Sequence, residues 1–131
     1  MLKSAFFFAV LVTAFGVRAE RIDVHANSFR EGGWSLDVQF MDVMGSPYLI
    51  AHGLGSPVPD AVATVRVPSS GRWRVWVRTR KWVDGAGLFK VLVSGKSLPH
   101  VFGRGASEWT WEDGGEVGGQ ECLALVVGFE W

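Results

Sequence analysis

The residues of this chain that could carry out acid–base chemistry are few and scattered. His25, His52 and His100 stand singly in the sequence, and a lone histidine is more often a hydrogen-bonded structural residue than a metal ligand. Glu112 and Asp113 are the nearest candidate pair for glycoside cleavage, which needs two carboxylates facing each other across the bond. Neighbours on a strand point to opposite faces instead. We therefore expect no catalytic activity from this chain alone.

The glycine pairs of the chain do not complete a nucleotide-binding motif. Gly53-x-Gly55, Gly85-x-Gly87 and Gly103-x-Gly105 each begin a dinucleotide fingerprint, but the third glycine is not at the required place. The chain also lacks the P-loop, G-x-S-x-G and H-E-x-x-H motifs. Cys122 is the single cysteine, and no carboxylate cluster has the spacing of a calcium loop. The sequence predicts no metal site and no cofactor in this chain.

Tryptophan and arginine provide the clearest binding chemistry. The segment RWRVWVRTR (72–80) alternates strictly, so that four arginines and one tryptophan share one face of a strand. Such a face cannot be a dry core without many acidic partners. An indole beside hydrogen-bonding groups suits a sugar ring, which stacks its C–H face on the aromatic ring. The candidate ligand-binding residues of this kind are Arg74, Trp76, Arg78, Trp82 and Trp111. The alternative for the tryptophans is a place in the core, which we favour for Trp34, Trp73 and Trp109.

A long apolar segment without regular period, QFMDVMGSPYLIAHGLGSP (39–57), is the second candidate binding region. Glycine and proline interrupt every regular pattern in it, and so long an irregular stretch is usually functional or disordered. Because it is too apolar for disorder, we expect a semi-rigid loop packed by its own side chains. The loop would present Asp42, Ser46, Tyr48 and His52 at the rim of the domain or to a neighbouring domain. A purely structural role, in which the loop only caps the domain, remains open.

The elements that would position these residues are strands. Short segments of period-two alternation recur and are punctuated by glycine or proline. In 72–80 the second face, Trp73, Val75, Val77 and Thr79, is predicted core. We expect turns at Ser94-Gly95 and Gly114-Gly115 and a buried last strand in CLALVV (122–127). With seventeen glycines and seven tryptophans, the sequence predicts an all-β domain, a β-sandwich or jelly roll of galactose-binding-like type. The expected strands lie at 34–40, 61–67, 72–80, 88–93, 97–102, 108–113 and 122–127.

The first nineteen residues have the pattern of a signal peptide. Lys3 precedes the apolar run Ala5 to Phe15, and small residues stand at Val17 and Ala19. We expect cleavage before Glu20 and a secreted or periplasmic protein; the alternative is a retained N-terminal anchor. The predicted domains are 1–19, signal peptide, and 20–131, a single β-sandwich module that is C-terminally truncated. Removing two basic residues leaves eleven against thirteen acidic ones, a net charge of −2. Neither nucleic acid nor a membrane is an expected partner of the processed chain.

Nearly all of the processed chain resembles a known module. It is similar to the β-sandwich region beside the catalytic part of large secreted bacterial FAD-dependent oxidoreductases, itself similar to the golvesin and xanthan-lyase type of carbohydrate-binding-like domain. The matching segments are GGW (32–34), QFMDVMGSPYLIAHGLGSPVPDA (39–61), GRWRVWVRTRKW (71–82), FKVLVSGKSLP (89–99), FG (102–103) and WTWEDGG (109–115). Two departures are the short VDGAG (83–87), where the family has a longer insert, and the end shortly after GF, where the family continues into a closing strand.

The resemblance implies an accessory module without catalytic activity of its own. FAD would belong to a parent protein and not to this chain. Two roles are open: the module binds glycan, or it docks onto a flavoprotein catalytic domain and shapes the entrance for the substrate.

Overall fold

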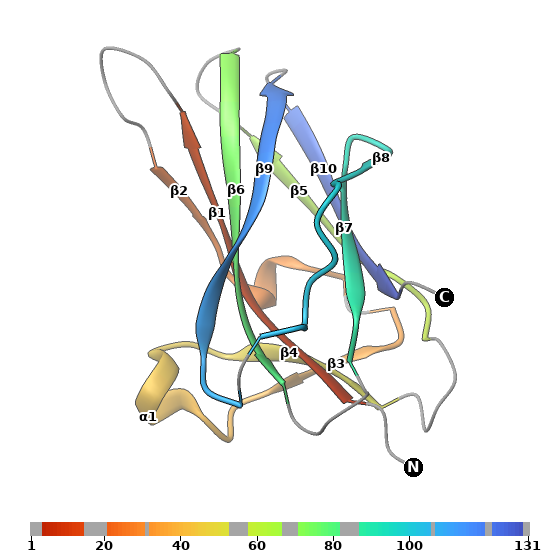
Figure 1. Ribbon diagram of the computed structural model, residues 1–131. Coiled ribbons are helices and arrows are strands. Elements are labelled where there is room, and N and C mark those ends of the chain that lie inside the picture. Colours follow the sequence, from red (N-terminus) through yellow and green to blue (C-terminus); the bar gives the residue numbers. More distant parts are fainter. Residues whose placement is uncertain are drawn as a thin grey trace.

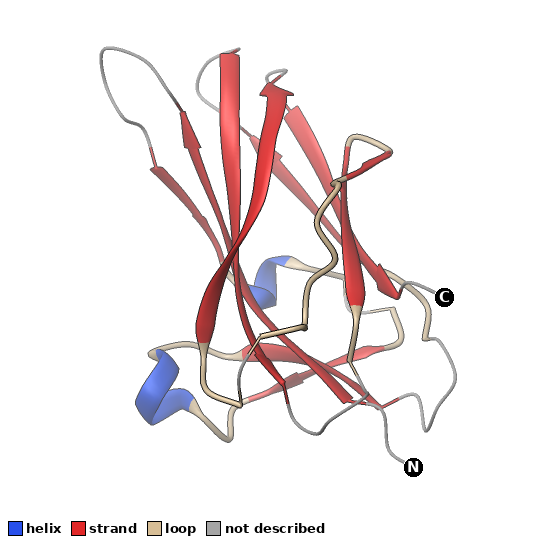
Figure 2. Ribbon diagram, viewed as in Figure 1, coloured by secondary structure: helices blue, strands red, loops and turns tan. Residues whose placement is uncertain are grey.

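The computed structural model describes residues 4–14, 21–30, 32–52, 58–66, 71–81, 87–105, 107–119 and 122–129. This part of the chain is all-β, as the sequence predicts, with two single-turn helical segments (Figure 2). In chain order the elements are β1 (Ser4–Ala14), β2 (Arg21–Val24), the 3-10 turn η1 (Ala26–Ser28), β3 (Trp34–Asp37), α1 (Met41–Met44), β4 (Tyr48–His52), β5 (Ala61–Arg66), β6 (Gly71–Lys81), β7 (Phe89–Val93), β8 (Lys96–Ser97), β9 (Thr110–Gly119) and β10 (Cys122–Phe129).

The strands form two antiparallel sheets (Figure 1). The first has the order β3-β4-β1-β6-β9, and β2 also pairs with β1. The second has the order β5-β10-β7-β8. Both sheets contribute to one hydrophobic core, which includes Trp73, Val75 and Val77 of β6 together with Phe89 and Val91 of β7. The β-sandwich arrangement and the more specific jelly-roll or galactose-binding-like topology stay predictions.

Alternation along the strands assigns their side chains to the core or to the outside as the sequence predicts. In β6 every second residue is buried, beginning with Trp73, which is fully enclosed. β5 and β7 show the same period, with Ala61 and Phe89 among the fully buried residues. Trp34 is also in the core, where its ring meets Phe89 edge to face at 5.8 Å between centroids. Period-two patterning is therefore a reliable guide wherever only one face of a strand is covered.

The apolar run that resembles a signal peptide forms the central strand β1 of the first sheet. One edge of β1 pairs with β6, from Ala5 opposite Lys81 to Ala14 opposite Trp73. The other edge is shared by β4, which pairs with the first residues of β1, and by β2, which pairs with the last. Cleavage of the segment stays a prediction. The structure adds that the segment links both halves of the first sheet.

The segment 39–57 is more regular than expected. Its first part forms α1, which ends at Gly45 in the left-handed conformation (φ 73°), where glycine is favoured. Its next part is the strand β4, between β3 and β1. The expectation of an irregular loop is wrong for β4, because an internal strand covered on both faces shows a continuous apolar run and no alternation. Residues 53–57 lie outside the described ones.

Two glycine-containing sites show how similar sequences give different local structures. Ser94 and Gly95 form the predicted tight turn between β7 and β8, and both have positive φ (49° and 80°), as a two-residue hairpin requires. The turn predicted at Gly114-Gly115 is wrong, since β9 continues through these residues with a bulge opposite β6. A Cβ on Gly114 would lie 2.8 Å from the ring of Phe102. Glycine at this position thus allows the core to pack closely against the bulge.

Candidate binding face on β6 and β9

The outward residues of β6 and β9 form one continuous surface. The register places Trp76 opposite Asp113, Arg78 opposite Trp111 and Arg74 opposite Glu116. Residues opposite each other in an antiparallel pair point to the same face. The surface, called here the Arg–Trp face, consists of Arg72, Arg74, Trp76, Arg78, Trp111, Asp113 and Glu116. Four of the residues predicted from the sequence, Arg74, Trp76, Arg78 and Trp111, are thereby brought together.

Carboxylates of β9 hold the guanidinium groups of β6 in place. Arg74 donates from Nε to Asp113 Oδ1 at 3.0 Å, and its Nη2 makes a further short contact with Oδ2. Its Nη1 lies 3.8 Å from Glu116 Oε1, and Arg72 Nε lies 3.6 Å from Glu116 Oε2. The hydrogen bond from Arg74 lowers the pKa of Asp113 and, in return, raises the pKa of Arg74. The prediction that this face is not a dry core is confirmed, since the side chains of Arg72 and Arg74 are 73% and 32% exposed.

Two indoles lie within this charged surface. Trp111 is 41% exposed, and the guanidinium carbon of Arg78 lies 6.0 Å from the centroid of its ring. Trp76 is half-buried, and the guanidinium carbon of Arg74 lies 5.9 Å from its ring. Both distances are within the range of a cation–π interaction. The exposed indole, the guanidinium donors and the carboxylate acceptors together can contact both the apolar and the hydroxyl groups of a ligand.

The end of this sheet face next to α1 is covered. Tyr48 is fully buried there and packs against Phe40 and Trp109, with ring centroids 5.7 and 5.3 Å away. Its hydroxyl donates to Asp37 Oδ2 at 2.7 Å. Burial, followed by this hydrogen bond, raises the pKa of Tyr48 above its usual range. The prediction that Tyr48 lies exposed at the rim is therefore wrong, because its ring fills the space beneath Phe40.

Four other residues were predicted from the sequence to bind a ligand or to lie at the rim of the domain, and the structure places only two of their side chains. Asp42 is exposed on α1, as expected, whereas Ser46 is buried, which corrects its expected place at the rim. His52 belongs to the backbone of β4, and its side chain lies outside the described part. Trp82 also lies outside the described residues. The structure therefore does not test the predicted roles of the His52 and Trp82 side chains.

A polar cluster around Glu112 was not recognised as a site from the sequence. The Glu112 side chain is 11% exposed and points to the inner face of β9. Its Oε1 lies 3.0 Å from His100 Nε2, and its Oε2 accepts from the Gly103 amide at 3.0 Å and from the Thr79 hydroxyl. Glu112 and Asp113 thus point to opposite faces, as predicted. A glutamate at an inward position of a strand is a signal that could have revealed the cluster, but its partners come from distant segments.

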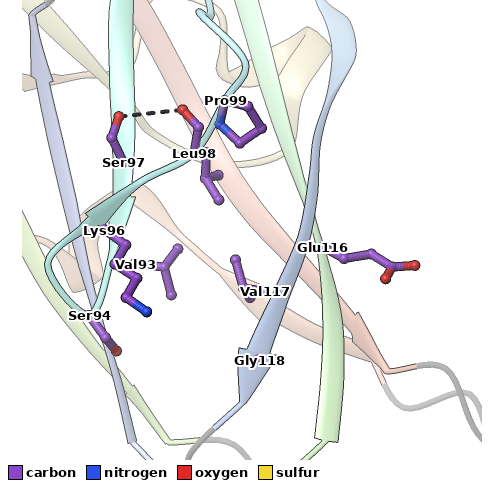
Figure 3. Close-up of a pocket in the computed structure, with 9 residues that line it drawn as sticks. All are labelled: Val93, Ser94, Lys96, Ser97, Leu98, Pro99, Glu116, Val117 and Gly118. Atoms are coloured by element: carbon purple, nitrogen blue, oxygen red, sulfur yellow. Dashed lines mark hydrogen bonds between the residues drawn. The ribbon is translucent and has the colours of Figure 1, made fainter.

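A groove of about 480 Å³ lies between the β7–β8 hairpin and β9 (Figure 3). Figure 3 shows Val93 and Val117 pointing toward each other across the hollow, with Leu98 beside them. Lys96 lines the groove, whereas Glu116 points away from it toward the Arg–Trp face. The groove and the Arg–Trp face thus adjoin each other at Glu116, which lines the groove while its carboxylate contacts Arg74.

Among the described residues, no helix is long and apolar enough to cross a membrane, and no group of three or more histidine, cysteine and acidic side chains could hold a metal ion. Comparisons with protein-family models, with curated proteins and with solved structures found no match to this chain.

Proposed function

We propose that this protein is a secreted or periplasmic, non-catalytic accessory module that binds glycan through the Arg–Trp face. The single observation that carries the proposal is the exposed indole of Trp111 beside Arg78, on the same surface as the fixed Arg74–Asp113 pair. The resemblance to accessory regions of FAD-dependent oxidoreductases and carbohydrate-active proteins supports the same role. No cofactor is required for it.

The chemistry of the face suits a sugar chain lying along the sheet. The C–H face of a pyranose ring can stack on Trp111, while its hydroxyls donate to carboxylates and accept from guanidinium N–H groups. Asp113 and Glu116 supply acceptors, and Arg72 and Arg78 supply donors. Because the arginines and carboxylates balance one another over much of the face, the proposed ligand is a neutral or weakly charged polysaccharide.

The test is affinity electrophoresis of the secreted protein through gels that contain single polysaccharides, with intrinsic fluorescence titration of any that retards it. We expect Trp111→Ala to weaken binding at least tenfold, which corresponds to about 1.4 kcal/mol. Trp111→Phe should retain part of the affinity, since a smaller aromatic face remains. Lys96→Ala, in the groove and off the face, is the matched control and should bind like the unchanged protein. Absence of retardation across a broad panel would overturn the proposal.

A second role, docking onto a flavoprotein catalytic domain, is favoured by a different surface. Around α1, Val38 is 58% exposed and Val43 64% exposed, and Met41 is also exposed. Neighbouring exposed apolar side chains often mark a contact with another protein. Docking predicts that a separately produced flavoprotein portion binds the module and that Val43→Asp weakens this binding. The retardation of the variant by polysaccharide, relative to a gel without polysaccharide, should stay unchanged. Unchanged binding by Val43→Asp would argue against docking through α1.

A further inference from the structure

The groove between the β7–β8 hairpin and β9 lies where each of the two sheets comes to an end. β9 ends the strand order of the first sheet, and β8 ends that of the second. Residues of both strands line the groove, and its volume of about 480 Å³ is typical of sites for small molecules. The groove therefore has the size of a ligand site, and the inference about its ligand is independent of glycan binding.

The floor of the groove is apolar. Val93 and Leu98 are buried members of the hydrophobic core, and Val117 is partly buried against the same core. Figure 3 shows the side chains of Val93 and Val117 facing each other across the hollow. A ligand with an apolar body would release water from apolar surface on both walls, and this release favours binding.

The charge that the lining presents to the groove is positive. The lining contains one cation, Lys96, and one carboxylate, Glu116. The Glu116 side chain points away from the hollow, and its oxygens lie 3.6 Å from Arg72 Nε and 3.8 Å from Arg74 Nη1. Lys96 is exposed, and in the described part of the chain no carboxylate forms an ion pair with it. The Lys96 ammonium is therefore available to an anionic ligand.

The walls limit the length of the ligand. On the β9 side the lining consists of Glu116, Val117 and Gly118, and three residues of an extended strand measure about 10 Å. A stable contact between two proteins usually covers about 800 Å² on each partner. A hollow of this length suits a small molecule and is too short for a docked polypeptide.

We propose that this groove is a binding site for a small organic monocarboxylate with an apolar body, about 10 Å long in total. The apolar body lies between Val93 and Val117, and the carboxylate pairs with the Lys96 ammonium. A carboxylate complements the one cation of the lining, whereas an ionised amine would be repelled by it. A phosphate dianion would need more hydrogen-bond donors than one ammonium group supplies.

The test is a titration of the purified, isotope-labelled protein followed by the amide signals in NMR spectra. The probes are phenylbutyrate, its neutral amide phenylbutyramide and the cation phenylbutylamine, which share one apolar body. Phenylbutyrate should shift the amide signals of Val93, Lys96 and Val117 with a saturable curve. The amide should bind about two- to fivefold more weakly, the usual contribution of an exposed ion pair, and the amine more weakly still.

Substitutions at Lys96 separate the charge of the groove from its shape. In Lys96→Met, phenylbutyrate and phenylbutyramide should bind equally, because the difference between them depends on the ammonium group. Lys96→Arg should retain the preference for phenylbutyrate. The matched control is Arg104→Met, which removes an exposed cation outside the lining and should leave both affinities unchanged.

A substitution on the opposite wall tests the apolar part of the site. Val117→Phe places a larger ring in the hollow, so it should weaken the binding of all three probes at least tenfold. The urea midpoint of this variant checks that it is folded. Should it not fold, the Lys96 variants keep the test decisive, because Lys96 is exposed and lies outside the core.

Three results would overturn the proposal. The first is the absence of a saturable shift with phenylbutyrate at millimolar concentrations. The second is a preference for phenylbutyrate that persists unchanged in Lys96→Met. The third is a shift of the Trp111 indole signal together with loss of binding in Trp111→Ala, which would place the anion on the Arg–Trp face instead of the groove.

Discussion

The two faces of the β6–β9 pair lie on the same two strands but differ in burial, in charge and in the role that we assign to them. On the inner face Trp73, Val75 and Val77 are fully enclosed. On the outer face Arg74 and Trp76 are partly exposed among carboxylates. The inner face joins the two sheets through one hydrophobic core, whereas the outer face presents groups that can contact a ligand. A single pair of strands thus supplies both the stability of the domain and its candidate site.

The comparison is sharpest for two neighbouring carboxylates. Glu112 points inward and is held by His100, Gly103 and Thr79. Asp113 points outward and is held by Arg74 and the amide of Gly115. The inner carboxylate connects β9 to the segment after β8, while the outer one fixes the arginine of the candidate site. Because the two carboxylates have different partners, we expect that separate substitutions can alter the stability of the domain and its ligand binding.

The largest expected effect is on the inner face. Trp73→Ala removes the largest fully buried side chain among the described residues, so the free energy of unfolding should fall by about 3–5 kcal/mol. Urea denaturation followed by circular dichroism measures it. Trp111→Ala, on the outer face of the neighbouring strand β9, should change stability by no more than about 0.5 kcal/mol. Similar losses for both variants would show that the two faces are not separable.

A smaller loss is expected when the inner carboxylate is replaced. Glu112→Gln keeps the shape but leaves fewer acceptors for the Gly103 amide, the Thr79 hydroxyl and His100. The free energy of unfolding should fall by about 1–3 kcal/mol, the usual cost of an unsatisfied buried polar group. Glu116→Gln, the same change on the outer face, is the matched control and should have almost no effect on the urea midpoint. A larger loss of stability in Glu116→Gln than in Glu112→Gln would show that the outer carboxylate contributes more to stability than the inner one.

At the covered end of the outer face, removing the Tyr48 hydroxyl should lower stability less than the inner-face substitutions do. Tyr48→Phe removes only the hydroxyl that donates to Asp37, so the loss should be about 0.5–1.5 kcal/mol. Tyr48→Leu also removes ring contacts with Phe40 and Trp109 and should cost more. Thermal and urea unfolding of both variants check this order. An unchanged stability in Tyr48→Phe would mean that the hydrogen bond makes no net contribution.

Much of the fold could be predicted because its signals are local. The burial of alternate residues in β6 follows from RWRVWVRTR alone, and the turn at Ser94-Gly95 follows from a glycine between two apolar runs. β4 could not be predicted in this way, since strands covered on both faces lose their alternation. At Gly114-Gly115 the same residues suit a turn or a bulge, and only pairing with β6 decides between them.

The candidate site was predictable only in part, for a related reason. Arg74, Trp76 and Arg78 share a face of one strand, and alternation was enough to group them. Their partners on β9 depend on a register between strands far apart in the sequence. The Glu112 cluster joins three separate segments in the same way. β1 is a further case, because an uncharged apolar run has the composition of both a signal peptide and an internal strand.

The smallest expected effect concerns the pH dependence of the outer face. Because its hydrogen bond with Arg74 lowers the pKa of Asp113 in the folded state, the unfolded state binds a proton more readily at this group. Its contribution to stability is therefore present above the unfolded pKa and is lost as the pH falls through the folded pKa. Asp113→Asn removes this contribution, so the decline of stability in acid should be shallower in the variant.

Urea midpoints of the unchanged protein and of Asp113→Asn between pH 7 and pH 3 measure the difference. The two curves should lie furthest apart at neutral pH and converge in acid, since protonation of Asp113 and its replacement by asparagine both remove the negative charge. Glu116 also faces Arg74, so Glu116→Gln serves as the comparison for a weaker contact and should shift the curve less. Parallel curves for Asp113→Asn and the unchanged protein would show that the Arg74–Asp113 pair positions the candidate site without adding pH-dependent stability.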